Sequence, residues 1–157
     1  MAIRRLNEEE KQRIDNILFY GTGSVESLIS SEELHQFVLN YNWDAGEESM
    51  RWVIRNPLCD KGTALLVYWH AISSTLCQYA LRQDVPEWLI SNYDLVTEIE
   101  EKYLSGFYKL SNLKFDPRND DEWDNVAEIT AKELKRPIPV EMMAASPGEE
   151  PERETLG

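Results

Sequence analysis

The sequence predicts a mainly α-helical protein: a single domain of helical hairpins with corners like those of α-solenoids. Three observations indicate this class. Apolar residues recur every three or four positions through most of the chain, as they do along one face of a helix. Short turns containing Gly, Pro, Asn or Asp separate these segments. With 157 residues and 42% hydrophobic side chains, the chain is long enough to bury one substantial core.

The first two predicted helices begin at polar caps. Asn7 and Glu10 have the spacing of a capping box, and the Gly-Thr-Gly sequence at 21–23 ends the helix that they open. Ser30 and Glu33 repeat the same spacing at the start of the second helix. An apolar stripe follows each cap, as on one face of an amphipathic helix.

The next two predicted helices meet at a corner. The third helix begins just after Asp44, its expected N-cap, and ends before Pro57, because proline excludes its predecessor from the helical region. Asp60 is the expected cap of the fourth helix, in which residues 63–71 are apolar almost all round. Such a helix is typically central and buried. Cys59 is expected to be a small buried hydrophobe, and the missing side chain at Gly62 permits close packing in the first turn.

The second half of the chain is less regular. Residues 73–83 are expected to continue helically after a kink. Pro86 is at a helix start that leads into a loop around Asn92, and helical spacing then recurs over residues 95–103. Residues 107–115 alternate only partly and predict a short strand or extended chain. A last helix is expected at 123–134. The domain is thus placed at residues 1–139.

Residues 140–157 are expected to form a flexible acidic tail. The composition shifts to Pro, Glu, Ala and Ser, and the part from Ser146 onward is expected to be disordered. Such a segment buries too little apolar surface to offset the entropy lost on ordering. Its removal from Ser146 is therefore expected to leave the melting temperature unchanged.

The charge limits the possible partners. With 16 basic and 29 acidic residues, the net charge is -13. This balance argues against nucleic acid and against anionic membranes, because phosphate groups need Lys and Arg. It suits a basic protein partner, or simply supports solubility. No apolar run has the length of a membrane span, no secretory signal is present, and two cysteines do not make a disulfide framework, so a cytoplasmic location is expected.

Signatures of catalysis or cofactor binding are not found in the sequence. His35, His70, Cys59 and Cys77 lack the local spacing of zinc ligands, and His70 is expected to be a core histidine. There is no phosphate-binding glycine-lysine loop and no nucleophile elbow. The acids between 116 and 124 do not follow the order of a calcium-binding loop. We expect no metal, no cofactor and no enzymatic activity.

Two groups of acidic residues are the candidate partner-binding sites. The first shares one face of a predicted helix, and the second surrounds a predicted turn. The groups are Asp94, Glu98 and Glu101, and Asp116, Asp120, Asp121 and Asp124. Runs of charge more often mark a solvated surface, so this reading remains open beside the functional one. The second group is favoured, because loop side chains project freely.

Several separated motifs carry a resemblance to a known family. In chain order they are Asn42-Trp43-Asp44-x-Gly46, Asn56-Pro57-x-Cys59-Asp60-x-Gly62-Thr63-Ala64-Leu65, Ile99-Glu100-Glu101, Gly106-Phe107-Tyr108 and Phe115-Asp116-Pro117-Arg118-Asn119. The pattern, over residues 40–139, resembles a bacterial family of small domains of unknown function. The resemblance implies a small cytoplasmic protein without catalytic residues. Some members resemble the immunity partners of secreted toxins.

These observations lead to one functional expectation and one alternative. The chain is expected to be a cytoplasmic immunity protein that binds a cognate toxin and occludes its active or substrate-binding surface. The acidic groups would pair with basic groups of the toxin. The alternative is a helical scaffold or adaptor protein with no inhibitory role.

Overall fold

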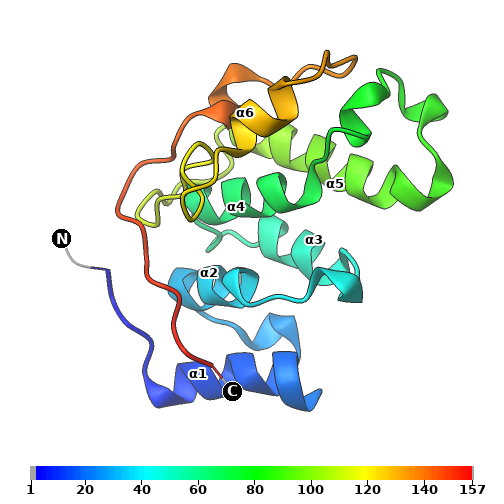
Figure 1. Cartoon of the computed structure of the whole chain (residues 1–157). Coiled ribbons are helices and arrows are strands. Elements are labelled where there is room, and N and C mark those ends of the chain that lie inside the picture. Colours follow the sequence, from blue (N-terminus) through cyan, green and yellow to red (C-terminus); the bar gives the residue numbers. More distant parts are fainter. Residues whose placement is uncertain (1–2, 157) are drawn as a thin grey trace.

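Helices account for the regular structure of the protein, as expected. The computed structural model describes residues 3–156, and within them there are six α-helices, no strand, and several short 3-10 or π-helical turns (Figure 1). The α-helices are α1 (Glu8–Asp15), α2 (Ser31–Leu39), α3 (Glu48–Arg55), α4 (Lys61–Ala71), α5 (Glu87–Leu104) and α6 (Asn125–Thr130). The prediction of a mainly α-helical single domain is confirmed.

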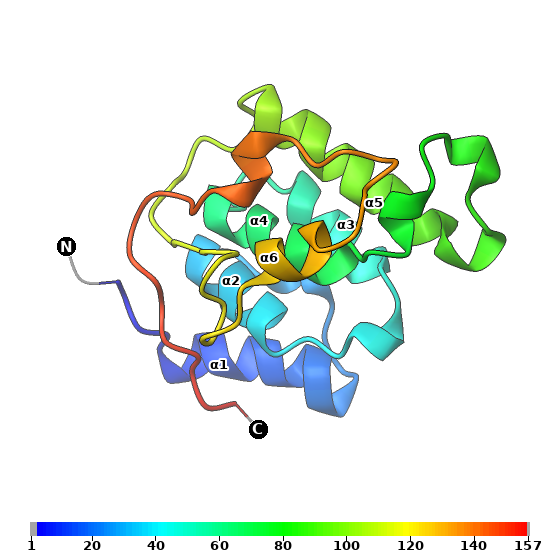
Figure 2. The same cartoon turned by 45° about the horizontal axis from the view of Figure 1, so that its top comes forward.

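Helix α4 lies at the centre of the fold. It packs against α2, α3 and α5, while α1 packs against α2. The helices thus form a stack from α1 through α2 to α4, with α5 and α6 beyond it (Figure 1). Turning the molecule brings α6 forward, where it lies over α4 (Figure 2). This arrangement covers α4 on all sides from Gly62 to Trp69.

The burial of α4 follows from its sequence. All residues from Gly62 to Trp69 are buried, as the apolar run predicted. The phenol group of Tyr68 is satisfied by a hydrogen bond to Oε2 of Glu100 at 2.6 Å. Arg136 pairs with both oxygens of this carboxylate at 2.8 and 2.9 Å. A polar group at this depth needs such partners, since an unpaired one would destabilise the core.

The corner before α4 has the structural role that was predicted. Cys59 is fully buried, and Oδ1 of Asp60 accepts from the backbone N–H of Gly62 at 2.9 Å. The other oxygen of Asp60 accepts from the backbone N–H of Asn112 at 2.7 Å. The N-cap therefore also fixes a segment far along the chain. A Cβ atom on Gly62 would lie 1.6 Å from the Leu113 carbonyl oxygen, so only glycine fits here.

Of the other three predicted caps, two are confirmed and one is wrong. The Asn7–Glu10 capping box is present, and the Ser30 side chain accepts from the N–H of Glu33. Asp44 does not cap α3, because it lies inside a separate 3-10 turn at Trp43–Ala45. The Asn42 side chain accepts from the N–H of Asp44, so that turn takes the place of the predicted helix start.

The prediction of a continuing helix over residues 73–83 is wrong. Two 3-10 turns, Leu76–Gln78 and Arg82–Asp84, stand there instead. The backbone of the first turn is hydrogen-bonded to residues far along the sequence. The carbonyl oxygen of Cys77 accepts from the N–H groups of Lys135 and Arg136 at 3.0 and 2.9 Å. The predicted loop around Asn92 is also wrong, because α5 runs unbroken from Glu87 to Leu104. The last helix is shorter than predicted, because α6 covers only Asn125–Thr130.

The prediction of a flexible tail is wrong, because the segment from residue 140 lies against the helices. A 3-10 turn at Val140–Met143 buries Met142, whose carbonyl oxygen accepts from the Trp69 indole at 2.8 Å. Ser146 is buried and bonds to Phe115, with its Oγ accepting from the Phe115 N–H at 2.8 Å. Residues 107–115 are extended, and Leu113 forms one parallel bridge with Glu149. Directed polar contacts order this segment, and composition does not reveal them.

Candidate functional site

The four potential zinc ligands do not converge. Nowhere between residues 3 and 156 do three or more His, Cys, Asp or Glu residues form a group that could hold a metal ion. Cys59 and Cys77 are separate buried thiols, and burial raises the pKa of both. His35 is buried, with its Nδ1 2.8 Å from Oγ1 of Thr63.

The expectation that His70 is a core histidine is wrong. Its side chain is exposed and stacks on the Trp43 ring, with centroids 5.5 Å apart. His70 stands at the end of α4, one position beyond the run of residues that is buried on all sides. The apolar pattern of its neighbours could not reveal this change of environment. His35 is the histidine in the core.

The predicted acids of α5 are mostly neutralised by nearby arginines. Asp94 accepts two hydrogen bonds from Arg82, both at 2.8 Å, and Glu98 accepts two from Arg55 at 2.7 and 2.8 Å. These guanidinium groups lower the pKa of both carboxyls. Glu101 is exposed on the same helix. The three acids share a helix, but two of their charges are already balanced within the protein.

Three of the predicted loop acids shape the loop itself. Asp116 accepts from the N–H of Arg118 at 3.0 Å, and Asp124 caps α6 by accepting from the N–H of Ala127 at 2.9 Å. Oδ2 of Asp120 accepts from the Asn125 side chain at 3.1 Å. Each carboxylate keeps a second oxygen, so a structural role does not remove its charge from the surface.

Asp121 stands at the tip of this loop. It is exposed, and its φ of 51° places it in the left-handed region, which Asp tolerates better than most residues. Glu122 follows with a φ of 70°. Backbone hydrogen bonds between Asp120 and Trp123 at 2.8 and 2.9 Å close the turn on both sides. The backbone of the tip is therefore closed by hydrogen bonds, while its carboxylates project into solvent.

The loop tip and the C-terminal segment together line one groove. Asp120 and Asp121 form one wall, and Glu150 and Glu152 contribute to the other. Leu39, Pro151 and Arg153 complete the lining of this hollow of about 630 Å³. We call it the acidic groove. The sequence could not place Glu150 and Glu152 here, because the segment that carries them was expected to be disordered.

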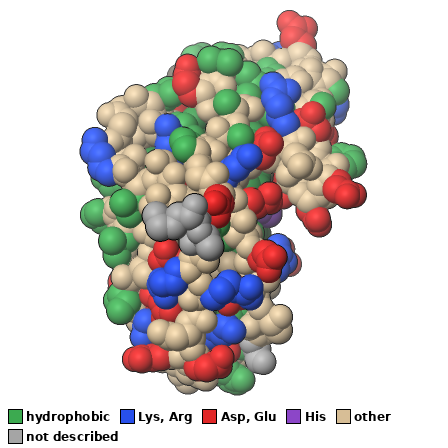
Figure 3. Space-filling model, turned by 90° about the vertical axis from the view of Figure 1, so that its left-hand side faces the viewer, with side chains coloured by type: hydrophobic (Ala, Val, Ile, Leu, Met, Phe, Trp, Pro, Cys, Tyr) green, Lys and Arg blue, Asp and Glu red, His purple; other side chains and the backbone are tan. Residues whose placement is uncertain are grey.

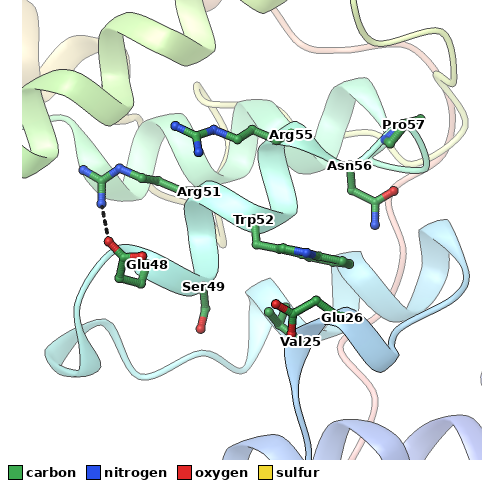
Figure 4. Close-up of a pocket in the computed structure, with 9 residues that line it drawn as sticks. All are labelled: Val25, Glu26, Glu48, Ser49, Arg51, Trp52, Arg55, Asn56 and Pro57. Atoms are coloured by element: carbon green, nitrogen blue, oxygen red, sulfur yellow. Dashed lines mark ion pairs between the residues drawn. The ribbon is translucent and has the colours of Figure 1, made fainter.

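A second hollow lies along α3 (Figure 4). It has a volume of about 660 Å³, and its lining residues are Val25, Glu26, Glu48, Ser49, Arg51, Trp52, Arg55, Asn56 and Pro57. The half-buried Trp52 ring extends between α3 and the turn that carries Val25 and Glu26 (Figure 4). We call it the Trp52 hollow.

The cations of the Trp52 hollow are already engaged. Arg51 donates to the carbonyl oxygen and the hydroxyl of Ser91 at 2.8 and 2.6 Å, and it lies 3.6 Å from Glu48. Arg55 is paired with Glu98. The hollow thus offers an aromatic surface rather than free positive charge. A half-buried tryptophan such as Trp52 can anchor a protein partner.

Comparison with known proteins finds one family model, which matches the helical centre of the chain. Residues 29–104 match the family model described as "Domain of unknown function (DUF4274)". This match spans α2 to α5 and includes most of the Trp52 hollow, whereas the residues of the acidic groove other than Leu39 lie beyond it. No curated protein and no solved structure matches the chain. Among the described residues, no helix is long and apolar enough to cross a membrane.

Proposed function

We propose that this chain is a non-catalytic immunity protein that binds a basic bacterial toxin in the cytoplasm. It neutralises the toxin by covering its active or substrate-binding surface. The observation that carries the proposal is the acidic groove, where four carboxylates from two distant segments line one hollow. The net charge of -13 adds a long-range attraction for a basic partner.

The groove suits capture by charge. Asp121 and Glu150 are exposed, and the one cation among the lining residues is Arg153. A turn whose backbone is already closed loses little backbone freedom on binding, which favours association. Lys and Arg side chains of a partner could pair with them, and such pairs mainly speed encounter and set specificity.

The experiment compares two double variants with equal change in net charge. Asp121→Asn with Glu150→Gln removes two of the four carboxylates of the groove, and asparagine tolerates the left-handed backbone at position 121. Asp84→Asn with Glu87→Gln neutralises two exposed acids before and at the start of α5. The association rate of each variant is measured with the cognate toxin. The product of the adjacent gene is the first protein to test as that toxin.

The groove variant should associate at least about threefold more slowly than the control variant at low salt. The difference should shrink at high salt, since the Debye length falls to about 3 Å at 1 M. Growth rescue of cells that express the toxin should weaken in the same order. Equal association rates for the two variants would remove the groove from the mechanism. Full growth rescue by a variant that does not bind the toxin would exclude occlusion as the mechanism.

The Trp52 hollow favours the alternative function, that of a helical scaffold or adaptor. Its floor is aromatic, its cations are engaged, and it lies largely within the matched family region. A partner held there would bind through apolar contact, with little dependence on salt. Binding that is insensitive to salt and abolished by Trp52→Ala would support the adaptor function over toxin neutralisation.

A further inference from the structure

Residues 149–156 lie against α2 and the N-terminal segment. The segment runs past α2 towards α1, beside the N-terminal segment (Figure 1). The buried Gln36 of α2 holds it by both ends of its amide: Nε2 donates to the Glu152 carbonyl oxygen at 2.8 Å, and Oε1 accepts from the Glu154 N–H at 2.9 Å. An amide that pairs with two alternate residues recognises an extended backbone whatever its side chains are.

The start of the segment is held as an added strand would be. The N–H of Lys114 donates to the Glu149 carbonyl oxygen at 2.8 Å, and the N–H of Glu149 donates to the Asn112 carbonyl oxygen at 3.1 Å. Leu113 and Glu149 form a parallel bridge. Main-chain pairing of this kind is a common way for proteins to bind extended peptides.

The far end of the segment contributes a selective contact. Glu154 is 3% exposed, and its Oε2 accepts from the Leu6 N–H at 2.8 Å. Its Oε1 lies 3.4 Å from Nε of Arg5 and 3.7 Å from Nζ of Lys11. Basic side chains gather over the lower part of this face of the molecule (Figure 3). A buried carboxylate between two cations selects for a glutamate at this position.

The segment buries few of its own side chains. Within residues 147–156 the buried side chain is that of Glu154, while Pro151 and Leu156 are half-buried. Oε1 of Glu154 is buried and makes no hydrogen bond within the described residues. With so little apolar burial, the segment can leave while the helices stay folded, since regions with few buried contacts open locally.

We propose that this groove, formed by Gln36, residues 112–114 and the N-terminal residues Arg5, Leu6 and Lys11, is a binding site for an extended acidic segment of a partner protein. The chain's own residues 149–156 occupy it until the partner displaces them. Recognition requires an extended backbone that pairs with the Gln36 amide as Glu152 and Glu154 do. It also requires a glutamate at the position of Glu154, two residues after the carbonyl group that Gln36 contacts. The residues that form the site are not those of the acidic groove, but its present occupant carries Glu150 and Glu152, so displacing the segment also opens the acidic groove.

The test uses the full chain and a fluorescent synthetic peptide with the sequence of residues 148–156. The protein variant Glu154→Ala weakens the internal contact and keeps the groove. It should bind the peptide at least about tenfold more tightly than the unchanged protein, because the competing segment reduces the binding-competent fraction. Glu141→Ala, at an exposed acid outside the segment, is the matched control and should bind like the unchanged protein. Fluorescence anisotropy gives each dissociation constant.

Two further changes test the two contacts separately. A peptide with Gln in the position of Glu154 should bind the Glu154→Ala protein at least about tenfold less tightly. Adding Gln36→Ala to this protein should abolish peptide binding, while circular dichroism shows that the helices remain. Equal affinity of the Glu154→Ala and unchanged proteins for the peptide overturns the proposal, and so does equal binding of a scrambled peptide.

Hydrogen exchange of the unchanged protein covers the case in which the variants fail to fold. The amides of residues 149–154 should exchange at least about 100-fold faster than those of α4, since local opening releases the segment alone. Exchange as slow as that of α4 contradicts a displaceable segment. A stable dimer of the unchanged chain that the peptide dissociates would assign the groove to the segment of a second copy, and would equally overturn the proposal.

Discussion

Gly62 and Leu113 pack with no room between their backbones. A Cβ atom on Gly62 would lie 1.6 Å from the Leu113 carbonyl oxygen and 2.8 Å from its carbon. Both contacts are with backbone atoms, which cannot rotate away as a side chain can. This packing joins the first turn of the central helix to the extended chain after α5.

Replacing Gly62 by alanine should therefore destabilise the fold. The α4 N-terminus or the extended chain has to shift, so we expect the free energy of unfolding to fall by about 3 kcal/mol. Gly21→Ala is a suitable control: it has a φ of 63° with nothing within 4 Å of the added Cβ, and should cost about 1 kcal/mol. Urea unfolding measures both. A loss at Gly62 no larger than that at Gly21 would contradict the close packing.

Asp60→Ala should cost more than the loss of an ordinary helix cap, which is about 1 kcal/mol. The carboxylate accepts from the N–H groups of both Gly62 and Asn112, and its removal leaves a buried donor without a partner. We expect a loss of about 2–4 kcal/mol. Asp44→Ala, at an exposed acid that caps no helix, should change stability by less than about 0.5 kcal/mol.

Binding to the partner provides a second readout for Asp60. The residue is fully buried, so a folded Asp60→Ala protein should keep its affinity for the partner. Measurement at low temperature, where the variant is folded, separates the two effects. Loss of binding with an unchanged melting temperature would instead make Asp60 a contact residue.

Buried His35 should make stability depend on pH. Burial lowers its pKa from 6.5 to about 4, so below pH 6.5 the unfolded chain binds a proton that the folded protein does not. Stability is thus full above 6.5 and falls as the pH decreases towards 4. Between pH 7 and pH 5 this group should account for about 2 kcal/mol.

Melting temperatures across this pH range test the assignment to His35. His35→Gln should flatten the dependence, even though it also lowers stability at neutral pH by disturbing the contact with Thr63. His70→Gln, at the exposed histidine, should keep most of the slope. A slope that survives His35→Gln and disappears in His70→Gln would reverse the two roles.

Removing residues 146–157 should lower the melting temperature, in contrast to the expectation from composition. The truncation deletes the buried Ser146 and its bonds to Phe115, the Gln36 contacts and the buried Glu154. We expect a loss of about 2 kcal/mol, or roughly 6 °C for a domain of this size. Removing only the exposed Thr155 and the residues after it should cost much less. An unchanged melting temperature after the longer truncation would show that the docking adds no stability.

Local signals explain which parts of the fold could be predicted from the sequence. The caps at Asn7, Ser30 and Asp60 depend on residues within three positions, and each of the three is confirmed. The apolar run of α4 likewise predicted its burial. At Asp44 a second local signal, the Asn42 side chain, prevailed and formed a 3-10 turn.

The predictions that failed depended on distant partners. The helix expected at 73–83 is absent because Cys77 accepts backbone hydrogen bonds from residues 135 and 136. The segment from 140 is ordered by contacts with Trp69, Phe115 and Gln36, which no compositional measure contains. For the candidate site, the sequence identified the acids, but it could not show that Arg55 and Arg82 neutralise the α5 pair, or that Glu150 and Glu152 face the loop.

The contacts that join the two ends of the chain have a consequence for folding kinetics. The hydrogen bond between Leu6 and Glu154 spans 148 positions, that between Gln36 and Glu154 spans 118, and that between Asp60 and Asn112 spans 52. Helical domains usually fold quickly because their contacts are local, and long loops must close here before these contacts form. We therefore expect this domain to fold more slowly than most helical domains of its size, with α4 and its neighbours forming first and the chain ends joining last.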